Sequence, residues 1–346
     1  MKIDANNQII KEKCGLKIVD FFKRILRRKD DKKLLDAPKT QYQKLVESID
    51  DLELCKMFVE RATRSVTPEI EKVIQKYGNK LYEYPLETKI SIGDTIELAQ
   101  RFFESIDRGL YEKYNAIVNG SNPNIMLQME EFNGKGASVN SPEKMPVTVY
   151  VPIRGDIRQL YELVHECTHT FDIDNGDTPT RKVLGEVAPQ CMERLLDDFL
   201  LGMSDEDMCK YGFDRERLEK DVRERRITTF LSRFHNAQDL DRRSGNRELD
   251  SRYMLAQIYS AHFNKFDKNE KKNKLLSFIE YVKNDEFDKA NTCFELSIDK
   301  HARLSGLHRE AYVGETISEV MDLVVPKEQE NAKEQQRKLD GEDIVR

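Results

Sequence analysis

The stretch that decides the fold is Val164-His165-Glu166-Cys167-Thr168-His169-Thr170, which contains two of the six histidines of the chain. On a helix, residues four positions apart lie on one face, about 5–6 Å apart, so both imidazoles can reach one metal ion. Glu166 then stands beside the remaining coordination positions, where hydrolysis needs a general base. The stretch therefore predicts a zinc site suited to peptide hydrolysis. The alternative is a buried helix that carries the same three side chains without a metal.

The residues before this stretch predict the setting that such a helix needs. The run from Pro146 to Ile153 is expected to form a strand, and its flanking prolines suggest a short or edge strand. Gly155 and Asp156 end the strand, and Asp156 with Gln159 is expected to form a capping box at the start of the helix. The side chains facing the core would be those of Ile157, Leu160, Tyr161, Val164, Thr168 and Phe171.

A catalytic zinc site usually takes three protein ligands and one water, so a third ligand is needed. The downstream candidates are Asp172, Asp174, Asp177, Glu186 and Glu193. The aspartates follow the helix too closely to turn back easily onto its histidine face. Glu186 lies seventeen residues after His169, which leaves room for a loop and a returning antiparallel helix. Pro189 fits the first turn of a helix that begins near Leu184. The alternative for Glu186 is a solvated helix carboxylate.

The segment Gly185-Glu186-Val187-Ala188-Pro189-Gln190-Cys191-Met192-Glu193 resembles the third-ligand segment of the thimet oligopeptidase and oligopeptidase F family of zinc peptidases. In that family the ligand glutamate is followed by small residues and proline, then by Gln four residues on and Glu seven residues on. Gln190 and Glu193 stand at those offsets from Glu186. The upstream run from Val147 to His169 is also similar to the family's core. The likeness covers about residues 147–200 and is weaker from about residue 90 onward.

This resemblance implies roles for the residues that match the family's motif. His165, His169 and Glu186 would be the ligands of one zinc ion, and Glu166 would be the general base and proton shuttle. The strand Val147–Ile153 would be an edge along which the backbone of the substrate is laid. The expected partner is thus a peptide or protein substrate.

The chain departs from the family in two places. The family carries a downstream motif rich in His, Gly and Tyr, whose tyrosines stabilise the oxyanion, and the nearest match here is Arg252–His262. Tyr259 and Tyr253 are the expected oxyanion donors, and the alternative for each is a packing role. The chain is also shorter than typical members, so the helices that enclose a deep channel are expected to be reduced.

Glu193, Cys167 and Cys191 lie near the expected ligands without being among them. Glu193 either orients a ligand histidine or is a solvated carboxylate, and the sequence leaves both alternatives open. The two cysteines are expected to pack and not to bind metal, because helical spacing turns Cys167 away from the histidine face.

Composition excludes several other classes of protein. Of the 346 residues, 38% are hydrophobic and 35% charged, which is typical of a soluble and largely helical chain. The formal net charge of −6 is too mild to indicate a nucleic-acid partner. The six cysteines have no CxxC spacing, which favours reduced thiols in a cytosolic setting. No apolar run approaches the ~18–20 residues of a membrane span, and no signal peptide is evident. A cytoplasmic protein is therefore expected.

Changes of character along the chain predict its domain organisation. Residues 1–40 form a charged leader, residues 41–326 a single metallopeptidase-like catalytic domain, and residues 327–346 a disordered polar tail. Within the leader, residues 16–28 form a basic amphipathic helix that either contacts a membrane or partner, or simply docks on the domain. The expected fold is mainly α (α+β), a zincin-like domain of many helices with one small β-sheet beside the metal helix.

Further elements are expected around this centre. A strand should begin at Ile125 and reach Met129 by its alternation, and helices are expected over residues 67–78, 91–106, 183–201, 214–226, 248–266, 275–282 and 286–296. The helix at 91–106 should begin with a capping box of Ser91 and Asp94, and that at 214–226 should be an exposed helix laced with opposite charges.

The function expected from these features is zinc-dependent hydrolysis of internal peptide bonds in oligopeptides. Two alternatives remain open. One is a non-catalytic binding protein that keeps the peptidase scaffold, and the other is a selective protease that acts on one folded protein. Zinc content and the cleavage of a mixed peptide library would distinguish the three.

Overall fold

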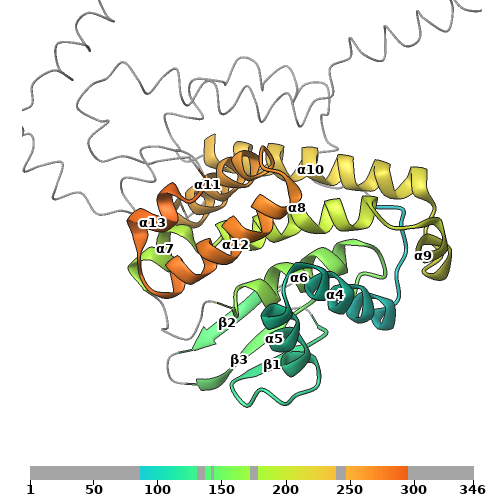
Figure 1. Ribbon diagram of the computed structural model, residues 1–346, viewed down its shortest axis with the longest axis horizontal. Helices are drawn as coiled ribbons and strands as arrows, with labels where there is room; N and C mark the ends of the chain where they lie inside the picture. Colours follow the sequence, from blue (N-terminus) through green and yellow to red (C-terminus); the bar gives the residue numbers. More distant parts are fainter. Residues whose placement is uncertain (1–85, 131–136, 142–143, 172–177, 239–246, 295–346) are drawn as a thin grey trace, which may run out of the picture. The chain divides into compact units, whose positions relative to one another are not determined.

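The computed structural model describes residues 86–130, 137–141, 144–171, 178–238 and 247–294. All of them belong to the second of two compact units, which spans Asp50–Arg346. This described part is mainly helical and contains one small sheet, as the sequence predicted (Figure 1). The predicted leader at 1–40, its helix at 16–28, the helix at 67–78 and the tail at 327–346 lie outside the described residues.

The sheet has three strands in the order β1-β3-β2, with β1 at Ile125–Gln128, β2 at Ala137–Ser141 and β3 at Lys144–Tyr150. β3 pairs in parallel with β1 and antiparallel with β2, so it is the central strand. The prediction that this segment is a sheet edge is therefore wrong. Pro146 is tolerated because the pairing with β1 begins only at Val147 and the register with β2 shifts between Val139 and Ser141.

Two helices precede the sheet in the chain and pack against each other. α4 (Ile92–Ile106) begins as predicted, with the Ser91 hydroxyl accepting the N–H of Asp94 at 3.0 Å. α5 (Arg108–Val118) follows after the single residue Asp107, whose carboxylate caps it. A cluster of buried aromatic rings joins these helices to the end of the metal helix, and its members are Phe102, Phe103, Tyr114 and Phe171.

The helix predicted to carry the two histidines is α6 (Arg158–Thr168), and its predicted core-facing residues are all buried. The predicted capping box at its start does not form. The Asp156 carboxylate accepts the N–H of Arg158, while the amide oxygen of Gln159 accepts those of Arg154 and Gly155. Both side chains thus satisfy backbone donors of the turn, but in a different pairing, and the N-cap residue is Ile157.

The helical segment predicted at 183–201 is divided into α7 (Pro179–Leu184) and α8 (Val187–Leu201). The break falls at Gly185-Glu186. A Cβ atom on Gly185 would lie 2.6 Å from the carbonyl oxygen of Arg181, so this close approach requires glycine. Pro189 lies in the first turn of α8, as predicted, where its missing N–H removes no helical hydrogen bond.

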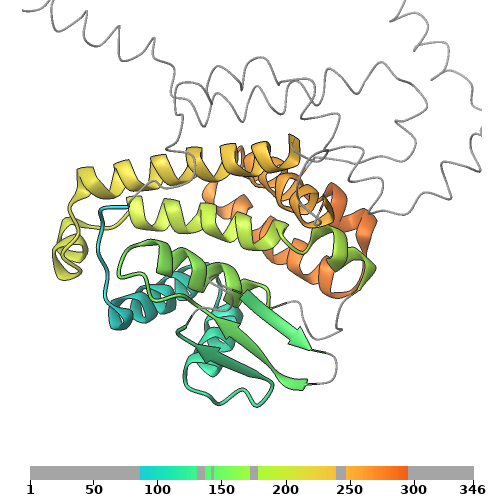
Figure 2. The ribbon, with the colours of Figure 1, turned by 180° about the vertical axis from the view of Figure 1, so that it is seen from behind.

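The remaining described helices are α9 (Asp205–Lys210), α10 (Arg215–Gln238), α11 (Arg247–Phe263), α12 (Lys268–Lys283) and α13 (Phe287–Thr292). Figures 1 and 2 show α8 between α6 on one side and α10 and α11 on the other. This central position explains why most of α8 is buried. The sheet, α4 and α5 lie on the far side of α6 from α8 (Figure 2).

α10 is not the simple exposed helix that its charge pattern predicted. Leu218 and Val222 are buried, and the fully buried Asp221 carboxylate accepts the N–H of Thr88 at 2.7 Å. Arg225 and Arg226 turn inward to carboxylates of α8. Interspersed charge does not by itself show which face of a helix is covered, because inward charges can be matched by partners that are remote in the sequence.

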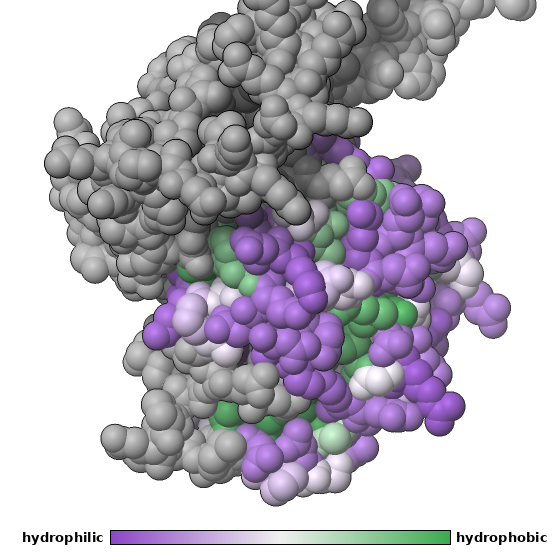
Figure 3. All heavy atoms as spheres, turned by 60° about the vertical axis from the view of Figure 1, so that its left-hand side comes forward, coloured by the Kyte–Doolittle hydropathy of each residue, from purple (hydrophilic) through white to green (hydrophobic). Residues whose placement is uncertain are grey.

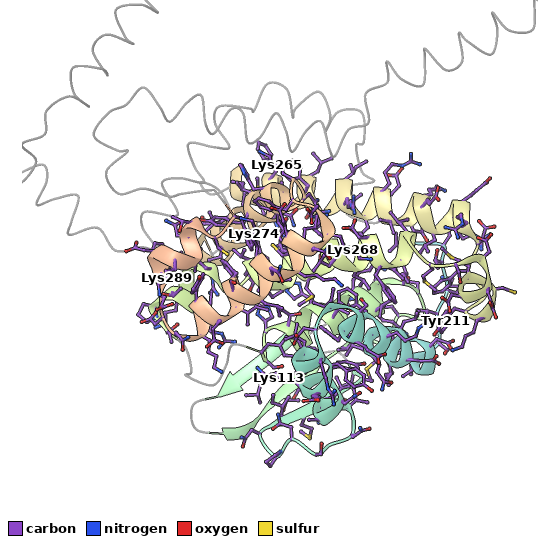
Figure 4. The ribbon with its side chains drawn as sticks, viewed as in Figure 1. Lys113, Tyr211, Lys265, Lys268, Lys274 and Lys289 are labelled. Atoms are coloured by element: carbon purple, nitrogen blue, oxygen red, sulfur yellow. The ribbon has the colours of Figure 1, made fainter. Side chains whose placement is uncertain are left out.

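One face of the described part is predominantly polar. On the face shown in Figure 3 most described atoms are hydrophilic, with limited apolar patches. The lysines labelled in Figure 4 include Lys274 and Lys289, whose ammonium groups lie over the rings of Phe266 and Tyr281 at 4.2 and 5.6 Å. No helix in the described ranges is both long enough and apolar enough to cross a membrane.

Candidate metal centre

The structure brings His165, His169 and Glu186 together. The two Nε2 atoms are 3.2 Å apart, and the Glu186 Oε2 atom lies 3.4 Å from the first and 3.6 Å from the second. These side chains are 12%, 13% and 8% exposed, so the cluster is largely shielded from solvent. Within the described residues this is the group of His, Cys, Asp or Glu side chains whose ligand atoms converge closely enough to hold a metal ion.

The separations fit a tetrahedral ion. Ligand bonds of 2.0–2.1 Å to a tetrahedral zinc place the ligand atoms about 3.3–3.4 Å from one another. The three observed distances scatter around that value. In addition, Glu186 Oε2 is a buried carboxylate oxygen without a hydrogen-bond partner. Such an atom is costly to bury unless something compensates its charge, and a cation at the centre of the three atoms would do so.

The local backbone holds the ligands in place from both sides. His165 lies in the last turn of α6, and His169 is the C-cap residue, still with right-handed helical angles, so their i and i+4 relation is kept. Arg181 donates a hydrogen bond to the carbonyl oxygen of His169 at 3.0 Å. Lys113, labelled in Figure 4, donates to the carbonyl oxygen of Phe171 at 3.2 Å. These cations satisfy carbonyl groups that the helix end leaves unpaired.

A buried chain of charged groups holds the far side of the His165 ring. Its Nδ1 atom lies 2.7 Å from Glu193 Oε1, and Glu193 Oε2 lies 2.5 Å from a guanidinium nitrogen of Arg225. Because an ionised carboxylate can only accept, Nδ1 carries a proton, which leaves Nε2 as the ring nitrogen that a metal ion would bind once Nε2 has lost its own proton. Of the two roles left open for Glu193, its geometry favours orienting the ligand.

A second chain runs parallel to the first, one helical turn away. The Tyr161 hydroxyl donates to Asp197, which also accepts from Arg226 Nε at 2.5 Å. Arg225 links the two chains, because its guanidinium lies 3.7 Å from the centre of the Tyr161 ring. Together the two chains of contacts hold α6, α8 and α10 in place against one another, next to the triad.

In the metal-free cluster the charges of neighbouring groups outweigh the effect of burial on each pKa. Burial alone would lower the pKa of His165, but the Glu186 and Glu193 carboxylates outweigh it and raise that pKa well above its usual value. Burial alone would raise the pKa of Glu186, yet the charge of His169 and contact with His165 hold it well below its usual range. For Glu193, burial is outweighed by Arg225 and His165, and its pKa falls to about 2. Both carboxylates therefore stay negative at neutral pH.

A cavity of about 520 Å³ opens beside the triad, and His165, Glu166 and Tyr253 contribute to its lining. Glu166 is 9% exposed and follows a ligand directly in the chain, which is where a base is required. Burial first, and then the negative charges of Glu186 and Glu166, raise the pKa of Tyr253. Its hydroxyl therefore remains protonated at neutral pH.

Tyr259, the other expected oxyanion donor, is placed elsewhere. It is fully buried, its hydroxyl donates to the Asn291 side chain, and its ring packs against Phe294. This is the packing alternative, and the structure does not bring Tyr259 to the cavity. The reason is helical geometry, since Tyr253 and Tyr259 are six residues apart on α11 and project to different sides.

The remaining residues considered near the triad are two cysteines, three aspartates and two arginines. Cys167 and Cys191 are fully buried in the core, as expected. The aspartates at 172, 174 and 177 lie outside the described residues. Sequence reasoning missed Arg225 and Arg233, which line the cavity from α10. Neither arginine belongs to a motif. Arg225 lay in the helix expected to be exposed at 214–226, and Arg233 lay beyond it.

Comparisons with models of protein families, with curated proteins and with solved structures found no match for this chain.

Proposed function

We propose that this protein is a zinc-dependent peptidase that hydrolyses internal peptide bonds of oligopeptides. One zinc ion per chain would be held by His165, His169 and Glu186. The observation that carries the proposal is the near-tetrahedral spacing of their three ligand atoms around an otherwise unpartnered carboxylate oxygen. In the metal-free cluster the nearest groups to that oxygen are the two histidine nitrogens, at 3.4 and 3.6 Å, and neither donates a hydrogen bond to it.

The proposed chemistry divides between metal and protein. Zinc bound at this site supplies a Lewis acid that polarises the scissile carbonyl and lowers the pKa of water to about 7. Glu166 accepts the proton of the attacking water and delivers it to the leaving amine. Tyr253, protonated at neutral pH, donates a hydrogen bond to the developing oxyanion, and a single donor of this kind is worth about 10²–10³ in rate.

The order of elements supports the same catalytic class. A strand, a turn, the His-Glu helix and a returning helix with Glu186 at its start follow one another in the chain. That order agrees with the resemblance to thimet oligopeptidase and oligopeptidase F, and we propose a zincin-like domain of that kind. Because β3 is a central strand, an incoming peptide cannot pair with it, so the expected docking of substrate on that strand is dropped.

The test is digestion of a mixed peptide library by the full-length, zinc-loaded protein, with and without a chelator. The parent should produce many short cuts, and Glu166→Gln should retain zinc and produce none. Glu162→Gln is the matched control, since it alters a cavity carboxylate one turn earlier on α6 that is paired with Arg154, and it should retain turnover. Cleavage by Glu166→Gln at the parent's rate would show the assignment to be wrong.

A further inference from the structure

The wall of the cavity opposite the metal helix is built by one face of α10. It presents hydroxyl, amide and guanidinium groups from Thr228, Thr229, Ser232, Arg233 and Asn236. At 1.5 Å per residue, the span from Thr229 to Asn236 is about 10 Å, which matches about three residues of an extended peptide. This wall is therefore long enough to contact the side chains on both sides of a bond held at the metal.

Within the described residues, not every arginine of the cavity is paired with a carboxylate. Four arginines contribute to its lining: Arg154, Arg158, Arg225 and Arg233. Three are paired with carboxylates, in the pairs Arg154–Glu162, Arg158–Asp156 and Arg225–Glu193. Arg233 has no carboxylate partner in the part of the chain that the structure describes; its guanidinium lies 3.8 Å from the centre of the Tyr253 ring. Of the four arginines that line the cavity, Arg233 is thus the one without a carboxylate partner among the described residues.

The contact with Tyr253 leaves Arg233 free to bind one. A guanidinium stacked on a ring uses its planar face, whereas its N–H groups point outward in the plane. Those N–H groups match the two oxygens of a carboxylate in a bidentate pair. Because Tyr253 also lines the cavity, a carboxylate bound there would lie close to the proposed oxyanion donor.

We propose that Arg233 binds a carboxylate of the substrate, so that this peptidase prefers peptides with an acidic group within about three residues of the scissile bond. The inference rests on the proposed function and adds its substrate class. The carboxylate has two sources, an Asp or Glu side chain or the C-terminus of the peptide. A purely structural role, in which Arg233 only holds the Tyr253 ring, would change the rate for all peptides alike.

The experiment uses the full-length, zinc-loaded protein and peptides that differ only in Glu or Gln at each of the three positions on either side of the cut. Each peptide is supplied as the free acid and as the C-terminal amide. The parent should favour the acidic peptide at one position by about tenfold in kcat/KM, or about 1.4 kcal/mol. A preference for the free acid alone identifies the C-terminus as the source.

Four variants separate recognition from positioning. Arg233→Gln should abolish the preference, and Arg233→Lys should keep part of it. Arg158→Gln removes a cavity arginine that already has a carboxylate partner and should keep all of it. Tyr253→Phe should slow both peptides of a pair equally. Binding of the same peptides to the Glu166→Gln variant should show the same ratio in Kd.

The two proposals fail in different ways. Equal cleavage of acidic and neutral peptides by the parent, or an unchanged preference in Arg233→Gln, overturns the role of Arg233 and leaves the peptidase proposal standing. If the parent cleaves no peptide, the peptidase proposal fails, and equal Kd values for the paired peptides then overturn the role of Arg233 as well.

Discussion

Replacing Glu193 with Gln should weaken zinc binding by about 10–100-fold, because it alters the group that orients a ligand histidine. The carboxylate serves two donors at once, with one oxygen 2.7 Å from His165 Nδ1 and the other 2.5 Å from Arg225. Glutamine has one oxygen. If that oxygen faces Arg225, the amide N–H₂ meets His165 and favours the tautomer with the proton on Nε2, which cannot bind metal.

The alternative orientation of the glutamine is also unfavourable. With its oxygen toward His165, its N–H₂ group meets Arg225, and a buried guanidinium loses its anion. Each tenfold loss of affinity corresponds to about 1.4 kcal/mol, so the expected range is about 1.4–2.7 kcal/mol. Competition with a chromogenic chelator measures this range directly.

The matched control for this prediction is Asp197→Asn. It removes a carboxylate from the parallel buried chain, which ends on Tyr161 and not on a ligand. Both variants should lower the thermal stability of the metal-free protein, but only Glu193→Gln should lose zinc affinity. Zinc binding of Glu193→Gln at the parent's affinity, or an equal loss in Asp197→Asn, would refute the reasoning.

Three more predictions follow from the same geometry. Because neighbouring carboxylates raise the pKa of His165, zinc must displace a proton from this residue, and zinc affinity should fall as pH falls through the neutral range. Calorimetry in two buffers should detect about one released proton. A zinc affinity that does not depend on pH would contradict this prediction. Tyr253→Phe should lower kcat by about 10²–10³, whereas Tyr259→Phe should lower only the melting temperature; the reverse pattern would exchange their roles. Gly185→Ala must displace the turn that carries Glu186 and should weaken zinc binding in a chelator titration. Gly202→Ala, at the other end of α8, should leave zinc binding unchanged. Equal effects of the two substitutions would argue against a link between the turn at Gly185 and zinc binding.

The parts of the fold that the sequence predicted are those with strong local signals. Ser91 caps α4, Ile125 begins β1, and α6 buries the side chains that its periodicity selects. The spacing of His165 and His169 is a local property of a helix, so their convergence could be predicted. Glu186 could be predicted because the seventeen residues after His169 leave room for a returning helix, and because its segment resembles the third-ligand segment of a peptidase family.

The features that the sequence did not predict depend on contacts between distant segments. β2 shows little alternation, yet it forms a strand by pairing with β3, and this changes β3 from an edge to a central strand. Arg225 and Glu193 are thirty-two residues apart, and no local pattern shows that one neutralises the other. Tyr253 and Tyr259 could not be separated without knowing which side of α11 faces the cavity.

Zinc content is the most direct test of the central claim. The purified full-length protein, saturated with zinc and then dialysed, should retain one zinc ion per chain by elemental mass spectrometry. Single replacements at His165, His169 and Glu186 should each abolish this retention, while the chain remains folded by circular dichroism. A parent protein without bound zinc, or a Glu186→Gln variant that retains a full equivalent, would contradict the account.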